Sequence, residues 1–305
     1  ELGIEVPAHA IKWIDSQVHR LWDERGATPG LPAVLAYLNV KHAHLIAREL
    51  ARLHSEPWQV LEDGFADSAA WPQELQGLIH HSIGLQWRHM PQNERTVLKL
   101  MSTMDLRPSQ IELVMSGRAA EELDAVELLD DPYLAAICTA TDMEPIDIRT
   151  VDRAMFPAAH AKWSSLVPEE CRIADPGDRR RLRAFMAEGL RVSAREGNTI
   201  ASERTLIEWA NGLNLTEPLG ITPALLAGHG LDTESLTNPS DWEPIVGARL
   251  GNNEPAYKLP ALEDAKHTIL DWVLPRIGAP AYDVNFDPRD QIDNILRASG
   301  HDSAV

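Results

Sequence analysis

The chain has few cysteines, fewer basic than acidic side chains, and no long apolar run. Its 305 residues include two cysteines, Cys138 and Cys171, which excludes a disulfide-stapled scaffold and a cysteine-rich zinc or iron–sulfur site. No run of about 18 apolar residues occurs, so we expect no membrane-spanning helix and a cytoplasmic protein. Lys and Arg number 28 against 46 Asp and Glu, and the net charge of −18 opposes nonspecific coating of the whole surface by nucleic acid.

Sequence motifs for nucleotide binding and hydrolysis are missing as well. There is no Gly-x-x-x-x-Gly-Lys-Ser/Thr loop, no Gly-x-Gly-x-x-Gly, no His-Glu-x-x-His and no Gly-x-Ser-x-Gly. The pairs His42/His44 and His80/His81 have spacings that diverge on a helix, which favours solvated or capping histidines over a metal site. We therefore assign no catalytic residue, no cofactor-binding residue and no metal ligand, and we expect no cofactor in this chain.

One thiol leaves two interpretations open. Cys171 precedes Arg172, whose charge could lower the pKa of the thiol and make it reactive. The alternative is a lone, inert thiol in a connecting segment.

Apolar residues make up 44% of the chain, enough for a packed core, and most of them recur at helical spacing. The first 90 residues indicate an amphipathic helix over 11–22, a second helix or bent pair over 34–53, and a helix that Pro72 opens and that buries Leu75 through Trp87. The middle region indicates helices over 94–104, 108–115 and 125–129. The last two, joined by a small polar loop, resemble the helical hairpin of many DNA-handling proteins.

The C-terminal third changes character. A helix over 178–195 is followed by a short extended piece at 198–200, by a helix that Ser202 caps and by another that begins at Thr222. Residues 245–250 and 255–259 then flank a turn, as in a β-hairpin. The order helix, strand, helix, helix, strand, strand is that of a winged helix.

The predicted fold is therefore mainly α, with a multi-helix N-terminal part, a helix-hairpin-helix-like middle, and a winged-helix-like C-terminal part that holds a small β-sheet. The predicted boundaries are an N-terminal helical domain over 1–90, a helix-hairpin-helix-like region over 91–168, a winged-helix-like domain over 176–277, and a linker or tail over 278–305.

Arginine is concentrated in one segment. Between residues 172 and 196, seven arginines oppose four acids, so this segment carries +3 in a chain of −18. We expect a phosphate-contacting row on the helix face opposite the apolar one. The alternative is a solvated face paired with acids from elsewhere. The predicted DNA-binding residues are Arg179, Arg180, Arg183, Arg191 and Arg195.

The candidate recognition helix of the winged part, unlike the arginine-rich helix, has no positively charged residue. Residues 222–230 contain no Lys or Arg, whereas a helix in the major groove normally supplies donors to bases and phosphates. This part of the winged domain is thus expected to pack against protein instead of reading bases.

Several runs resemble a known family. The run Glu127–Leu134 (ELLDDPYL) resembles the segment after the helix-hairpin-helix unit in RecD-like superfamily 1 DNA helicases, and Asp105–Gln110 looks like the preceding hairpin. Residues 179–199 and 256–260 are similar to the helical and winged segment before the ATPase core. Pro145–Pro157 (PIDIRTVDRAMFP) is similar to a recurrent block of a long actinobacterial-type subgroup.

The resemblance covers residues 22–277 and implies an N-terminal accessory region of an ATP-dependent DNA helicase. It implies ATP and Mg²⁺ in the parent protein only, weak contact with single-stranded or forked DNA, and the ATPase core of the same polypeptide as a partner. Because the chain begins with Glu1 and not Met, we expect it to be a piece of a longer protein or a processed product.

One loop departs from the family pattern. Where relatives have a glycine loop that lets the backbone approach phosphate, this chain has Thr139–Glu144, without glycine and with two acids. That change argues against phosphate binding at this loop. The competing hypothesis is a protein-interaction scaffold that recruits a nuclease or another DNA-processing or defence partner; a stand-alone hydrolase is disfavoured by the missing motifs.

Overall fold

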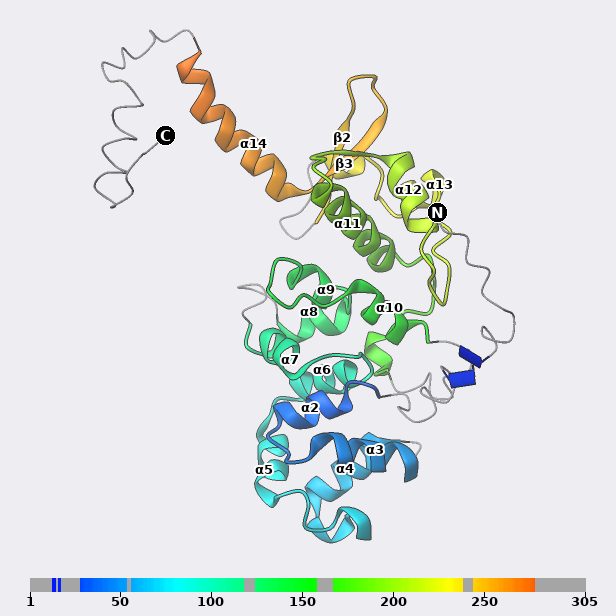
Figure 1. Cartoon of the computed structure of the whole chain (residues 1–305), viewed down its shortest axis with the longest axis vertical. Helices are drawn as coiled ribbons and strands as arrows, with labels where there is room; N and C mark the ends of the chain where they lie inside the picture. Colours follow the sequence, from blue (N-terminus) through cyan, green and yellow to red (C-terminus); the bar gives the residue numbers. More distant parts are fainter. Residues whose placement is uncertain are drawn as a thin grey trace, which may run out of the picture. The chain divides into compact units, whose positions relative to one another are not determined.

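The fold is mostly helical, with one small antiparallel sheet (Figure 1). It forms two compact units, residues 1–260 and 261–305. The computed structural model describes residues 13–14, 16–17, 28–53, 56–117, 124–157, 167–237 and 244–277.

Of the two alternatives predicted over 34–53, one helix or a bent pair, the structure has the pair, α2 (Leu31–Tyr37) and α3 (Ala43–Leu53). The chain between them uses left-handed backbone at Asn39 (φ 62°) and His42 (φ 57°), which ends one helix and redirects the chain into the next. Of the helix predicted over 11–22, residues 13, 14, 16 and 17 are helical, and the rest lies outside the described residues.

The single helix predicted after Pro72 is wrong. In its place are two short 3₁₀ turns, η1 (Ser68–Ala70) and η2 (Gln73–Leu75), and then α5 (His81–His89). Gly77 adopts φ 75°, a left-handed conformation that interrupts helical hydrogen bonding, and α5 starts afresh at its His80 cap.

An additional helix, α4 (Pro57–Ala66), was not expected from the sequence. Pro57 breaks the preceding pattern and also occupies the first turn of this helix, where its missing N–H costs nothing. The helix packs on α5, with the Trp58 and Trp87 rings stacked at 5.1 Å between centroids.

The middle helices are close to the predicted ranges. The first of them buries Val97, Leu98, Leu100 and Met101, and Gly117 (φ 67°) follows the second. The second helix packs on α2 and the third packs on the first. The helices that the structure describes in this region are α6 (Gln92–Ser102), α7 (Pro108–Met115), α8 (Ala125–Asp130), α9 (Leu134–Cys138) and α10 (Ile148–Met155).

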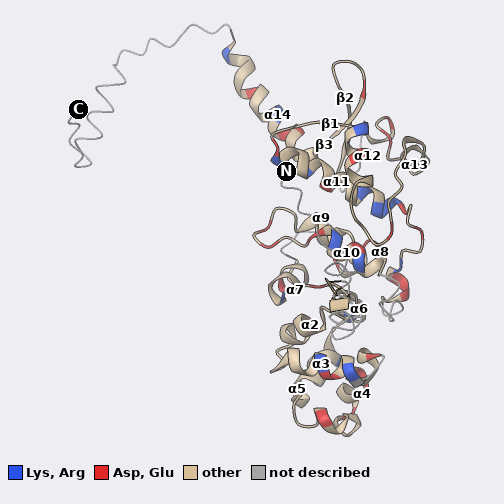
Figure 2. Ribbon diagram, turned by 45° about the vertical axis from the view of Figure 1, so that its right-hand side comes forward, with Lys and Arg blue, Asp and Glu red and all other residues tan. Residues whose placement is uncertain are grey.

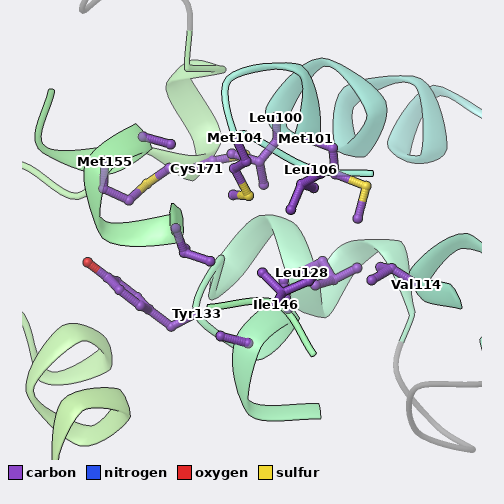
Figure 3. Packing of buried hydrophobic residues seen from close by; sticks show 14 of the residues in the cluster. Leu100, Met101, Met104, Leu106, Val114, Leu128, Tyr133, Ile146, Met155 and Cys171 are labelled. Atoms are coloured by element: carbon purple, nitrogen blue, oxygen red, sulfur yellow. The ribbon is translucent and has the colours of Figure 1, made fainter. Parts of the chain in front are cut away.

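The core of this region lies between α6 and the α8–α9 segment. Figure 3 shows Met101, Met104 and Leu106 facing Leu128 and Ile146 across it. These side chains are at most 8% exposed, so the layer excludes water and holds α8 and α9 in place.

The C-terminal part of the first unit runs α11 (Arg179–Arg195), β1 (Ala201–Ser202), α12 (Glu203–Asn211), α13 (Pro223–Gly228), β2 (Val246–Arg249) and β3 (Pro255–Lys258), with a 3₁₀ turn, η4 (Ser235–Thr237), before β2. The order helix, strand, helix, helix, strand, strand is as predicted. All strand pairs are antiparallel, and β3 lies between β1 and β2.

The first strand lies later than predicted, at 201–202 instead of 198–200. Gly197 (φ 94°) ends α11, and the Asn198 N–H donates to the Ser193 carbonyl oxygen at 3.0 Å. The backbone at 198 is therefore used in closing the helix and is not available to the sheet.

The second unit contributes α14 (Pro260–Val273) and a 3₁₀ turn, η5 (Leu274–Arg276). The helix has no buried residue, and Ile269, Trp272 and Ile277 are between 61% and 70% exposed. None of the described helices is both long and apolar enough to cross a membrane. The tail predicted over 278–305 lies outside the described residues.

Candidate functional site

The arginine-rich helix α11 forms as its sequence predicts. The Asp178 carboxylate caps it by accepting a hydrogen bond from the Arg180 N–H at 2.9 Å. Its apolar face is buried, including Leu182, Phe185 and Leu190. The arginines of α11 appear among the blue segments in Figure 2.

The most deeply buried arginine was not among the predicted site residues. Arg181 has no exposed surface, and its guanidinium donates to both carboxylate oxygens of Asp152, at 2.6 and 3.0 Å. The Tyr133 hydroxyl donates to the same carboxylate at 2.6 Å, and the Phe156 ring lies 4.4 Å from the guanidinium carbon. Burial raises the pKa of the Tyr133 hydroxyl well above its ordinary value, so the hydroxyl remains a donor.

Two of the predicted site residues connect α11 to the end of α8, at Asp130 and Asp131. Arg180 forms an ion pair with Asp178 at 2.8 Å and also donates to the Asp130 carbonyl oxygen. Arg183 pairs with the carboxylate of Asp131. Burial raises the pKa of Asp131, against the opposing pull of Arg183, whereas the Arg180 guanidinium lowers the pKa of Asp178.

The expectation that this face is exposed is wrong for most of its length. The side chain of Arg183 is 11% exposed and that of Arg191 is 17%, because the α8–α9 segment covers them. Arg191 donates to the Ile137 carbonyl oxygen at 3.2 Å, and Arg179 donates to that of His229 at 3.2 Å. Of the five predicted residues, Arg195 alone is more than half exposed, at 63%.

Arg195 lies at a cleft of about 340 Å³ between the α9–α10 segment and α11–α12. Arg149, from the first turn of α10, is 59% exposed and lines the same cleft. The ring of Trp209 on α12 also lines it, and this ring packs against Gly189, where a Cβ atom would come within 2.8 Å of it. The acids at the cleft are Asp147 and Glu188, and its apolar side chains include Ile148, Val192 and Leu213.

The sequence reasoning missed Arg149 and Trp209 as neighbours of Arg195. Arg149 lies in the run Pro145–Pro157, which the sequence distinguishes only by its family resemblance, and Trp209 lies in a helix that carries no charge signal of its own. Their meeting depends on how α10 and α12 both pack on α11, which helical periodicity does not encode.

The loop Thr139–Glu144, which contains no glycine, is held in place by one of its own carboxylates. The Glu144 carboxylate pairs with Arg107 at 3.0 Å and accepts a hydrogen bond from Ser109, which together lower the pKa of Glu144. A neighbouring cleft of about 440 Å³ is lined by Asp105, Asp147 and this glutamate.

The structure resolves the two interpretations of Cys171. The thiol is fully buried, and burial raises its pKa to about 12. The hypothesis of a thiol activated by Arg172 is therefore wrong, and Cys171 packs as a small apolar residue in the core of Figure 3. Burial likewise raises the pKa of Cys138 to about 11.

The histidine pairs lie at the surface. His80 caps α5 by accepting a hydrogen bond from the Ser82 N–H at 3.3 Å, and His81, His42 and His44 are exposed. Among the described residues, no group of three or more His, Cys, Asp or Glu side chains is placed to hold a metal ion.

Comparison with known proteins gives no relationship: no protein-family model, no curated protein and no solved structure matches this chain.

Proposed function

We propose that this chain is a non-catalytic accessory region of a RecD-like ATP-dependent DNA helicase, which positions single-stranded or forked DNA for a motor domain outside the chain. The observation that carries the proposal is the order of elements from α11 to β3, with the strand order β1–β3–β2. We interpret this connectivity as that of a winged helix, in which α13 would be the recognition helix and the β2–β3 turn the wing. The helix-hairpin-helix-like assignment of the middle region rests on the sequence resemblance.

The charge distribution supports weak and sequence-tolerant contact. Helix α13 has no Lys or Arg, so it offers no bidentate donor to a base edge. Arg249 in β2, next to the proposed wing, already pairs with Glu234 at 3.3 Å. Phosphate contact would then depend on a few exposed arginines within a chain of net charge −18.

The chain itself would hydrolyse no ATP, because no Gly-Lys pair exists to cradle phosphates. In a parent helicase, ATP and Mg²⁺ would be bound by the motor domain, and the ATPase core would be the partner within the same polypeptide. Turnover by the purified chain that a substitution within it abolishes would contradict this part of the proposal.

The direct test is fluorescence anisotropy of labelled single-stranded and forked DNA. We expect weak binding that falls at least about sevenfold between 50 and 200 mM salt, the dependence that two phosphate contacts give on a single strand. Absence of binding with up to about 100 µM protein at 50 mM salt, the weak end of ordinary nonspecific affinity, would reject the DNA-handling function.

The alternative function is a protein-interaction scaffold for a nuclease or another DNA-processing or defence partner. Two observations favour it. Most of the α11 arginines are engaged inside the fold, and α14 exposes a set of large apolar side chains that includes Ile269, Trp272 and Ile277. Apolar patches of this kind mark protein contacts more often than DNA contacts. Failure of the anisotropy test would leave this function in place.

A further inference from the structure

The cleft beside Arg195 combines an aromatic ring, an apolar wall and two exposed arginines. Its volume of about 340 Å³ is at the lower end of the range for small-ligand sites, which run from about 300 to 1,000 Å³. Trp209 and Leu213 come from the α12 side, Val192 and Arg195 from α11, and Ile148 with Arg149 from α10. Three separate helices thus bring one ring and two guanidinium groups to the same hollow.

Arg149 and Arg195 can exchange their present carboxylate partners for a bound anion. Arg149 pairs with Asp147 at 3.5 Å, and Arg195 pairs with Glu188 at 3.3 Å, and both arginines are more than half exposed. Solvent-exposed ion pairs contribute about 0–1 kcal/mol, so exchanging a carboxylate for a phosphate costs little. By contrast, the arginines that fasten α11 to α8–α9 are covered and have no such freedom.

Asp147 and Glu188 each have a second partner that remains when Arg149 and Arg195 bind a phosphate instead. Asp147 caps α10 by accepting a hydrogen bond from the Arg149 N–H at 2.8 Å. Glu188 also pairs with Arg191 at 3.6 Å. Neither acid is left without a compensating group, which limits the electrostatic penalty of admitting a phosphate.

The ring of Trp209 packs against α11 at Gly189. Gly189 on α11 lets the ring lie directly against the helix backbone, since any side chain at 189 would collide with it. The ring is half-buried and lines the cleft. A flat aromatic surface beside cationic side chains is the combination that binds unpaired bases without sequence preference.

We propose that this cleft holds one nucleotide of a single strand, with its base against Trp209 and its flanking phosphates on Arg195 and Arg149. The inference rests on the proposed DNA-handling function and gives it a location different from the arginine row expected from the sequence. A cleft of this size takes one base, so the contact depends on one base and about two phosphates.

The experiment compares three proteins on a fluorescein-labelled dT₁₂ strand by anisotropy: the parent chain, Arg195→Glu and Arg52→Glu. Arg52 is the matched control, because it is 64% exposed on α3 and pairs with a glutamate on its own helix, as Arg195 does. We expect Arg195→Glu to weaken binding about tenfold at about 50 mM salt and to make the salt slope less negative by about 0.7, the share of one phosphate. Arg52→Glu makes the same change in net charge and should leave both quantities within about twofold of the parent.

A second measurement leaves the protein unchanged. The same strand with every base replaced by an abasic tetrahydrofuran keeps its phosphates and loses its stacking, so its affinity for the parent chain should fall about tenfold. Far-UV circular dichroism of both variants reports that they are folded.

The outcomes separate the two proposals. If the parent binds dT₁₂ and the Arg195→Glu and Arg52→Glu proteins bind it equally well, the cleft is not the site, although DNA handling stands. Equal binding of the abasic and normal strands likewise overturns the role of Trp209. If the parent does not bind at all, both the cleft and the DNA-handling function are rejected.

Discussion

Arg181 and Asp152 are both removed from solvent, and each is the charged partner of the other in a buried ion pair. The pair is surrounded by the Tyr133 hydroxyl, the Phe156 ring and the Pro176 carbonyl oxygen, which accepts from Arg181 at 3.0 Å. Removing one partner of a buried pair leaves an uncompensated charge. We therefore expect Asp152→Ala to lower the free energy of unfolding by about 3–5 kcal/mol in urea titrations.

Glu49→Ala is the surface counterpart of that substitution, because it breaks the pair with exposed Arg52 and should cost about 0–1 kcal/mol. Replacing both buried partners, as Arg181→Met with Asp152→Leu, should recover much of the loss. Equal, small effects of Asp152→Ala and Glu49→Ala would mean that water reaches the pair.

Asp178 gives the fold a dependence on acid pH. Its hydrogen bonds from Arg180 lower its pKa below the ordinary value of 3.8. A carboxyl whose pKa is lower in the folded state contributes stability that is present above pH 3.8 and is lost as the pH falls through the folded pKa. We expect Asp178→Asn to lower the free energy of unfolding at about pH 6 and to flatten its decline below about pH 4, as measured by urea titration at each pH. A decline of unchanged steepness would assign the acid dependence to other carboxyls.

At the level of elements, two glycines on helix ends predict opposite outcomes. At Gly30, the N-cap of α2, an added Cβ atom would lie 2.1 Å from the Met104 carbonyl oxygen and 2.4 Å from that of Met101. Gly30→Ala should therefore force α2 away from the end of α6 and cost about 1–3 kcal/mol or more. The measurement is the shift of the urea midpoint.

Gly228, at the end of α13, is the comparison for Gly30. Nothing lies within 4 Å of an added Cβ atom there, and its φ is not positive. Gly228→Ala should stabilise by about 0.4–1 kcal/mol through the unfolded state. If Gly228→Ala lowers stability as much as Gly30→Ala does, the close approach of α2 to α6 does not explain the cost of the substitution at Gly30.

The elements best predicted from the sequence are those whose local signals agree. Helix α11 has an aspartate cap, an apolar stripe and a terminal glycine, and the β2–β3 hairpin has its Gly251 turn between two strand-like runs. The stretch from Pro57 to Trp87 was predicted poorly, because its apolar residues serve two helices and two 3₁₀ turns that meet through the Trp58–Trp87 stack. Periodicity does not separate consecutive short elements that share one core.

At the level of the whole chain, composition and periodicity predicted a mainly helical protein with a small sheet but could not place its arginines. A helical wheel divides α11 into an apolar face and a charged face, and local spacing predicts that the charged face is exposed. The structure brings α8–α9 over that face through Asp131 and the Ile137 carbonyl oxygen, which lie 52 and 54 residues from the arginines that they contact. Contacts between residues so far apart in the sequence do not affect the local spacing of residue types. For the same reason, the cleft with Arg149 and Trp209 could not be predicted from the sequence.

The arginine row yields the last prediction, which concerns how the first unit holds together. Arg180 and Arg191 donate to backbone carbonyl oxygens of Asp130, the last residue of α8, and of Ile137 in α9. In Arg180→Glu with Arg191→Glu, both donors are replaced by carboxylates that face those oxygens, and the new carboxylate at position 180 would also lie beside that of Asp178. Hydrogen bonds from charged groups contribute about 1.5–3 kcal/mol each, so we expect the double variant to lose at least about 3 kcal/mol of unfolding free energy.

The loss should be visible as a lower urea midpoint by far-UV circular dichroism. Arg195→Glu is the control on the same helix, because Arg195 is mostly exposed and its replacement should change the unfolding free energy by no more than about 0.5 kcal/mol. The comparison matters for any DNA experiment on this chain: a double variant that binds DNA poorly because α8–α9 has come away from α11 says nothing about phosphate contact. If the double variant is as stable as the parent, Arg180 and Arg191 do not hold α8–α9 to α11. The arginine row of α11 would then be exposed to solvent and would again be a candidate for binding DNA.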